Sequence, residues 1–220
     1  MARRVRRTVR VLLALGSAAG VTVALAQVPA QGAFTAVSGS TGNSVASAAD
    51  FCTAPGPTTL YSVGDSWTDF SAQAATHGGD TFLKVSSSAS TTARTWLRFG
   101  LTRPAGCFLT SAQLQVRART PAAGRTIDVY RGDPLAPQWT SSTITWGNQP
   151  SGVGTAVGNG SLTSAGWQTW TVTDHVREQL RAGNNGFVLQ DRNEGAGAVE
   201  QIYEDLQNAT YPPTLVLVWG

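Results

Sequence analysis

Residues 112–119 read Ala-Gln-Leu-Gln-Val-Arg-Ala-Arg, and residues 95–101 read Thr-Trp-Leu-Arg-Phe-Gly-Leu. In the first stretch Ala, Leu and Val alternate with Gln and Arg, and in the second Leu and Phe alternate with Trp, Arg and Gly. Because successive side chains of a strand point to opposite faces, each stretch predicts a strand with one buried and one exposed face. Such strands are typical of an antiparallel sheet.

Similar short runs continue from Thr59 to the end of the chain, separated by clusters of Gly, Pro, Asn and Ser. Further strands are expected at residues 81–85, 125–131, 142–146, 168–173, 186–190, 200–203 and 214–219. One short helix is expected, with an N-cap at Thr173 or Asp174 and a stop at Gly183. The glycine-rich residues 151–164 are expected to form a loop. The pattern predicts an all-β fold, a jelly-roll-like antiparallel β-sandwich with one short helix.

The chain is expected to have three parts. Residues 1–32 are expected to be a signal peptide, residues 33–58 a flexible N-terminal arm or linker, and residues 59–220 the β-sandwich domain. The leader combines an arginine cluster with an apolar run over residues 11–26, shorter than the roughly 20 residues that span a bilayer. A cleaved signal is therefore favoured over a membrane anchor. We expect a secreted, extracellular or cell-surface protein with no stable membrane insertion after processing.

Charge and composition exclude two classes of protein. The 220-residue chain has a formal charge of +3, but five of its 16 Lys and Arg lie in the expected leader. Without them, the 13 Asp and Glu outnumber the cations. Nucleic-acid binding needs clustered cations that displace counterions, so no nucleic-acid partner is expected. Only 13% of the residues are charged and 24 are Gly, which argues against a coiled coil or helical bundle.

The two cysteines of the chain are Cys52 and Cys107. Two cysteines in an exported protein most simply form one disulfide. The alternative, a reactive thiol pair, lacks the Cys-x-x-Cys spacing and an adjoining His. We therefore expect a structural disulfide.

The sequence favours a protein without catalytic activity. Its two His lie far apart and lack the spacing of a zinc site, and His175, in the expected helix, is placed on the surface. Two carboxylate pairs could in principle serve a glycosidase: Glu200 with Glu204, and Asp191 with Glu194. Acids in loops are more often solvated or bound to a cation, so no catalytic residue is assigned.

Calcium is the one cofactor that the sequence leaves open. Extracellular calcium sites take oxygen ligands from Asp, Glu and backbone carbonyls. Five acidic residues are candidates: Asp65, Asp69, Glu200, Glu204 and Asp205. They match no EF-hand or other spaced motif, and the alternative is that they are charges at the rim of the domain.

Sugar binding uses flat aromatic faces, cations for acidic groups and polar groups that fix orientation. Trp96 and Tyr130 fall out of phase with the buried side chains of their own strands, which places them on the outer face of a sheet. Four arginines share this outward register or lie nearby: Arg94, Arg98, Arg117 and Arg119. These six residues are the candidate ligand-binding site. The alternative is that a loop covers Trp96 and that the arginines only solubilise the sheet.

Two motifs carry a resemblance to a known family. Residues 143–150 read Thr-Ile-Thr-Trp-Gly-Asn-Gln-Pro, and residues 172–176 read Val-Thr-Asp-His-Val. Together with residues 96–101, where Gly100 stands in place of the usual Asp, they resemble the bacterial DNRLRE-type domain, which includes a family of carbohydrate-binding modules. The likeness extends over roughly residues 62–219. The missing carboxylate leaves any role that depends on it in doubt.

The resemblance implies a secreted jelly-roll domain that binds polysaccharide, with Trp139, Trp146 and Trp170 in its core. We therefore expect a secreted, non-catalytic module that binds an extracellular or cell-wall polysaccharide. The alternative is a structural subunit of an extracellular fibre or surface assembly, in which residues 33–49 add a strand to a neighbour's sheet. This alternative is motivated by residues 32–49, which resemble the start of secreted proteins that are cut by the SipW type of signal peptidase.

Overall fold

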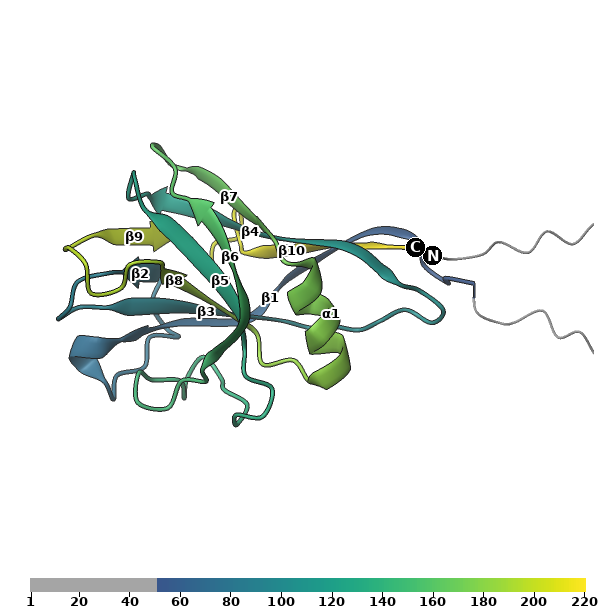
Figure 1. Ribbon diagram of the computed structural model, residues 1–220, viewed down its shortest axis with the longest axis horizontal. Helices are drawn as coiled ribbons and strands as arrows, with labels where there is room; N and C mark the ends of the chain where they lie inside the picture. The colour runs from purple at the N-terminus through teal and green to yellow at the C-terminus, as the bar shows by residue number, and fades with distance from the viewer. Residues whose placement is uncertain (1–50) are drawn as a thin grey trace, which may run out of the picture. The chain divides into compact units, whose positions relative to one another are not determined.

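The structure is a computed structural model in which residues 51–220 are described (Figure 1). Its elements, in chain order, are β1 (Gly56–Asp69), a 3₁₀ turn (Phe70–Ala72), β2 (Leu83–Ser86), β3 (Ala93–Phe99), β4 (Leu109–Thr120), β5 (Thr126–Gly132), β6 (Gly152–Gly160), β7 (Gly166–Thr171), α1 (Thr173–Ala182), β8 (Phe187–Asp191), β9 (Glu200–Tyr203) and β10 (Thr214–Trp219). These strands pair only in antiparallel fashion. The predicted all-β antiparallel sandwich with a single short α-helix is confirmed.

Two predictions concern the part of the chain that precedes the described residues. The predicted signal peptide and most of the predicted arm fall within residues 1–50, outside the described range. From residue 51 to residue 220, no helix combines the length and the apolar character needed to cross a membrane.

Strand β1 belongs to both layers of the sandwich. Residues 56–61 pair with β10, residues 62–69 pair with β3, and a bulge separates Ser62 from Gly64. The first sheet therefore runs β1-β10-β4-β7, and the second runs β1-β3-β8-β5-β6. Strands β2 and β9 pair with each other and connect β3 to β4, so hydrogen bonds continue from one sheet to the other on that side as well.

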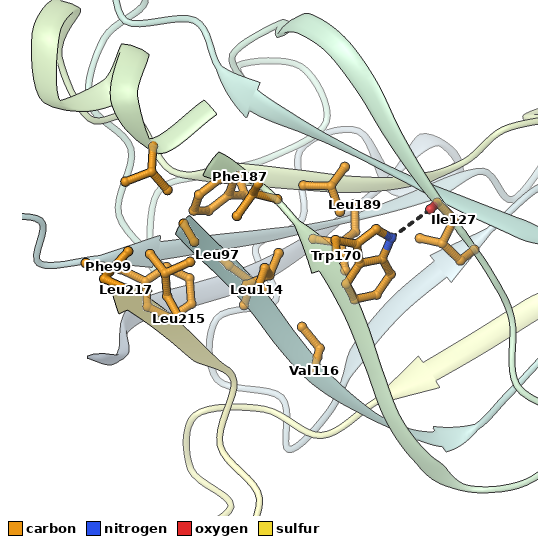
Figure 2. Packing of buried hydrophobic residues seen from close by; sticks show 14 of the residues in the cluster. Leu97, Phe99, Leu114, Val116, Ile127, Trp170, Phe187, Leu189, Leu215 and Leu217 are labelled. Carbon is orange, nitrogen blue, oxygen red and sulfur yellow. Dashed lines mark hydrogen bonds between the residues drawn. The ribbon is translucent and has the colours of Figure 1, made fainter. Parts of the chain in front are cut away.

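The hydrophobic core lies between the two sheets and follows the alternation of the sequence (Figure 2). Leu114 and Val116 of β4 point inward towards Leu97 of β3 and Leu189 of β8, while their chain neighbours face outward. Trp170 of β7 crosses between the layers, where its indole Nε1 donates a hydrogen bond to the carbonyl oxygen of Ile127 at 2.9 Å. The strands predicted at residues 95–101 and 112–119 are therefore correct, and so is the core position of Trp170.

Strand β6 corrects one prediction, because its residues were expected to form a loop. Gly152–Gly160 instead pairs with β5 along the edge of the second sheet. Two of the glycines that made it look like a loop are needed for packing. A Cβ at Gly152 would lie 3.2 Å from the Cβ of Tyr130, and one at Gly158 would collide with the ion pair of Asp128 and Arg192.

Residues 142–146 correct a second prediction, because they form turns rather than a strand. They belong to the segment 133–151, which connects β5 to β6. The amide of Asn148 closes this turn: its Oδ1 accepts from the Thr145 N–H at 2.7 Å, and its Nδ2 donates to the Thr143 carbonyl at 2.8 Å. A strand was predicted here because the apolar residues Ile144 and Trp146 are two positions apart, as in an alternating strand.

Helix α1 ends at Gly183 as predicted, but its first turn differs from the expectation. The N-cap residue is Val172, and the Thr173 hydroxyl accepts a hydrogen bond from the Ala112 N–H instead of capping the helix. His175 is 95% buried rather than exposed, with its Nε2 3.3 Å from the Val129 carbonyl. It fits because Gly154 faces the ring: a Cβ there would lie 3.0 Å from Cε1 of His175. Burial lowers the pKa of this imidazole.

The predicted disulfide between Cys52 and Cys107 is present. It ties the segment before β1 to the turn before β4, and the adjacent Thr53 N–H donates to the Ala105 carbonyl at 3.1 Å. Cys107 is fully buried against the core. The bond therefore fixes one end of the sandwich, where the first residues of β1 lie beside the last residues of β10.

Replacing both Cys52 and Cys107 with Ala is expected to lower the free energy of unfolding by about 2–4 kcal/mol, because the disulfide closes a 55-residue loop in the unfolded chain. Urea unfolding of the oxidised wild type and of the double variant measures this difference. The reduced wild type is the control and should resemble the variant. A difference below about 1 kcal/mol would show that the cross-link constrains the unfolded chain little.

Candidate functional site

The outer face of the second sheet is covered by the segment 133–151. Trp96, expected on an exposed face, does point outward from β3, but it is completely buried there. Its Nε1 donates to Gln149 Oε1 at 3.1 Å, and its ring packs edge-on against Trp139 with centroids 6.1 Å apart. Exposure was thus wrongly predicted for Trp96, and the alternative of a covering loop is correct. Tyr130 packs against the same cluster, and burial raises the pKa of its phenol.

Arg94 and Arg98 hold this covering layer in place. Arg98 Nη1 donates to the Trp139 carbonyl at 2.7 Å, and its guanidinium lies 5.4 Å from the centre of the Trp139 ring. Arg94 forms two hydrogen bonds of 2.7 Å to the carboxylate of Glu194 and lies 4.8 Å from the Trp146 ring. Trp139 is buried as predicted, whereas Trp146 is only half-buried.

The outer face of the first sheet carries the other two predicted arginines. Arg117 and Arg119 point outward from β4, because Val116 and Ala118 occupy the inward positions. Trp167 of β7 stands directly opposite Arg117 in the ladder. We call the surface formed by Arg117, Arg119, Trp167 and Tyr211 the β4–β7 face; Tyr211 comes from the connection between β9 and β10.

The four side chains of the β4–β7 face are held together by stacking and by one carboxylate. Arg117 lies 4.0 Å from the centre of the Tyr211 ring, and this ring meets Trp167 at 74° with centroids 6.3 Å apart. Glu204 is buried and accepts from Arg117 Nη1 at 3.2 Å, with Arg119 Nη1 4.0 Å away. Trp167 remains 43% exposed and is the one exposed tryptophan among the seven, all of which the structure describes.

Sequence reasoning missed both aromatic residues of this face. For Trp167 a signal existed: it lies three positions before the buried Trp170 in the same strand, so the two rings must point to opposite faces. The predicted strand began at Gln168, one residue too late to include it. Tyr211 lies in a connection without periodicity, and its position depends on Asn208, whose Oδ1 accepts from the Tyr211 N–H at 3.0 Å.

This arrangement combines an exposed aromatic ring with an oriented guanidinium. Aromatic rings offer apolar faces to the C–H groups of sugar rings, and arginine presents planar donors to hydroxyl or carboxylate oxygens. Arg117 uses one nitrogen for Glu204, and the others are free of protein acceptors within residues 51–220. The face is open and lies on a sheet, which suits an extended ligand rather than a small enclosed one.

Residues 56–218, from the start of β1 almost to the end of β10, match the model of carbohydrate-binding module family 96. The chain belongs to carbohydrate-binding module family 96. None of the curated proteins compared with the chain matches it. The match agrees with the carbohydrate-binding part of the resemblance drawn from the sequence, whereas the DNRLRE type and the SipW-type leader stay predictions.

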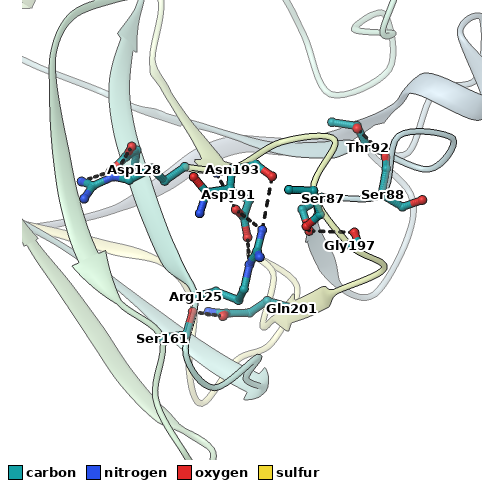
Figure 3. Close-up of polar contacts among 12 residues, drawn as sticks. Ser87, Ser88, Thr92, Arg125, Asp128, Ser161, Asp191, Asn193, Gly197 and Gln201 are labelled. Carbon is teal, nitrogen blue, oxygen red and sulfur yellow. Dashed lines mark hydrogen bonds and ion pairs between the residues drawn. The ribbon is translucent and has the colours of Figure 1, made fainter.

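The acidic residues considered for catalysis each have a cationic partner in the module. Asp191 is buried and forms two hydrogen bonds to Arg125, at 2.8 and 2.6 Å (Figure 3), and Glu194 binds Arg94 as described above. Glu200 pairs with Lys84 at 2.8 Å. These carboxylates neutralise cations on neighbouring segments and so help to hold those segments together.

The five carboxylates considered for calcium are not brought to one place. Asp69 accepts from the Ser71 N–H and so caps the 3₁₀ turn, while Glu200 and Glu204 pair with cations. The described residues contain no cluster of three or more His, Cys, Asp or Glu placed to hold a metal ion. Asp65 lies beside Asp205, because Asp65 Oδ2 accepts from the N–H of the next residue, Leu206, at 2.7 Å.

Asp65 and Asp205 are each 2% exposed, and neither forms an ion pair with a residue in the described range. Burial, reinforced by repulsion from Asp205, raises the pKa of Asp65 to about 6. Burial also raises the pKa of Asp205, whose Oδ2 has no hydrogen-bond partner within residues 51–220. The pair therefore costs stability when it is charged.

Replacing Asp65 with Asn is expected to raise the free energy of unfolding at neutral pH, because the folded wild type must then keep a buried carboxylate charged. In the unfolded chain the same carboxyl has its ordinary pKa of 3.8, so the folded state binds the proton more tightly. The wild type should therefore gain about 2 kcal/mol as the pH falls from about 7 to about 4. Asn at this position removes the gain, so the advantage of the variant should shrink as the pH falls.

Urea unfolding of both proteins across this pH range measures the difference. Glu200→Gln is the control, since its side chain is 52% exposed; it should change stability by less than about 0.5 kcal/mol. A difference between Asp65→Asn and wild type that does not vary with pH would contradict the raised pKa.

Proposed function

We propose that this module is secreted and binds an extracellular or cell-wall polysaccharide through the β4–β7 face, without catalysing a reaction. The observation that carries the proposal is the exposed ring of Trp167 beside the guanidinium of Arg117, which Tyr211 and Glu204 hold in place. Membership in a carbohydrate-binding module family supports the ligand class. The rival outward face, at Trp96, is closed by the segment 133–151.

The rigidity of the β4–β7 face supports binding of a flexible polymer. Arg117 and Trp167 stand on paired strands, and Glu204 is anchored further by Asn208, whose Nδ2 donates to its Oε2 at 3.0 Å. A guanidinium that is already oriented loses little side-chain freedom when a ligand arrives, so more of the contact energy appears as affinity. Arg119 and Arg117 together also offer positive charge to acidic sugars.

Secretion is supported by two features that are far apart in the chain. The apolar run at residues 11–26 follows an arginine cluster, as in a signal peptide. The disulfide between Cys52 and Cys107 is of the kind that persists in oxidising compartments. Detection of the mature protein in culture medium, with its N-terminus near residue 33, would test this part of the proposal.

Trp167→Ala and Arg117→Gln are each expected to weaken binding at least about tenfold, because they remove the central aromatic and cationic contacts of the β4–β7 face. The full chain would first be tested for retention on a panel of neutral and acidic polysaccharides, followed by titration calorimetry with the retained polymer. If that polymer is acidic, added salt should weaken the wild type more than Arg117→Gln. A parallel series with a chelator tests the calcium prediction.

Two variants outside the face serve as controls. Phe108→Ala removes an aromatic side chain that is 69% exposed, and Arg181→Gln removes an exposed cation of α1. Both should bind like the wild type. Absence of retention on every polymer, or equal weakening by the control variants, would overturn the proposal.

A further inference from the structure

A cleft of about 440 Å³ lies where the edges of the two sheets separate, away from the β4–β7 face. Strands β6 and β7 are connected at residues 161–165, and near this connection Gln168 Nε2 donates to the Gly160 carbonyl at 3.0 Å. Towards the start of β6 and the end of β7, no such bridge joins the two strands in the described chain. The cleft occupies this space, with Thr155 and Val157 on one wall and Thr171 on the other.

Arg131 of β5 is the charged group at the inner side of this cleft. It continues the inward series of Ile127 and Val129, so its half-buried side chain points towards the space between the sheets. Its Nη1 is buried and has no hydrogen-bond partner among residues 51–220, and Arg131 forms no ion pair there. A buried guanidinium nitrogen without an acceptor lowers the stability of the folded protein. An acceptor supplied by a bound ligand would remove this penalty.

The other groups in the cleft suit an anion with polar surroundings. Thr155 and Thr171 line the walls, and the first turn of α1 contributes Thr173 and His175. No side chain caps this ten-residue helix, so the N–H groups of its first turn lack that partner.

Two acids also line the cleft, but both are neutralised by arginines of the same helix. Asp174 pairs with Arg177 at 3.1 Å, and its side chain is 92% exposed. Glu178 pairs with Arg181 at 2.6 Å, which lowers the pKa of Glu178 and keeps it charged. The charge of Arg131 also helps to lower the pKa of Glu178, but Arg131 itself forms no ion pair within residues 51–220.

We propose that this cleft binds a small oxyanion, a carboxylate or sulfate group, with the Arg131 guanidinium as its main contact and Thr155 beside it. The volume leaves room for a group the size of one sugar ring to carry the anion. The site is separate from the β4–β7 face and does not rest on the function proposed for it, so either can fail while the other stands.

The test titrates the full chain with acetate, inorganic sulfate, glucuronate and glucose, and follows the backbone amide signals by NMR. The three anions should shift the signals of residues 154–155 and 171–175 in a saturable manner, whereas glucose, which lacks the charge, should not. Tighter binding of glucuronate than of acetate would indicate that the anion is carried on a sugar, and equal binding would indicate a site for the free ion.

Arg131→Gln is expected to weaken anion binding at least about tenfold, since it removes the charge-assisted hydrogen bonds. Arg103→Gln is the matched control and should retain the affinity of the wild type, because the exposed Arg103 neither lines the cleft nor pairs with an acid that does. If Arg131→Gln fails to fold, Thr155→Val provides a second variant that should weaken binding without removing a charge. Equal binding by wild type and folded Arg131→Gln, or no saturable shift with any anion, would overturn the proposal.

Discussion

The division of β1 between two sheets is the constraint on which the rest of the structure depends. Its first residues extend the sheet of β10 and β4, and after the bulge at Ser62 and Gly64 its remaining residues extend the sheet of β3. The two layers are therefore joined by continuous backbone hydrogen bonding along β1. Trp170 fits the gap between them because its indole reaches the Ile127 carbonyl across it.

The outer face of one sheet is covered and that of the other is open, because the connections between their strands differ. Strand β5 is followed by a long connection, residues 133–151, which folds back over Trp96 and makes a second small core with Trp139 and Ile144. Strand β4 is flanked by β10 and β7, and its outward arginines meet single side chains of neighbouring segments, such as Tyr211 and Glu204, and no covering segment. The outward arginines of β3 are consequently part of the structure, while Arg117 of β4 remains available to a ligand.

Most of the fold could be predicted from local alternation, because a strand that keeps to one sheet buries every second residue. Strand β1 shows no such clear pattern, since its register shifts where it changes sheets, and the glycines of β6 conceal an edge strand. For the site, alternation correctly turned Arg117 and Trp96 outward. It could not reveal which of the two a loop would cover, because that depends on contacts between distant segments such as Gln149 with Trp96.

The ladder that carries Arg117 and Trp167 also has a mechanical consequence. Strand β4 is hydrogen-bonded to β10 over residues 109–115 and to β7 over residues 113–118. A polymer that adheres to these side chains and is pulled along the strand direction would load many backbone hydrogen bonds at once, in shear. Tension across the strands would instead open them one after another. The module is therefore built to resist drag along the axis of β4 more strongly than peeling from the side of β7.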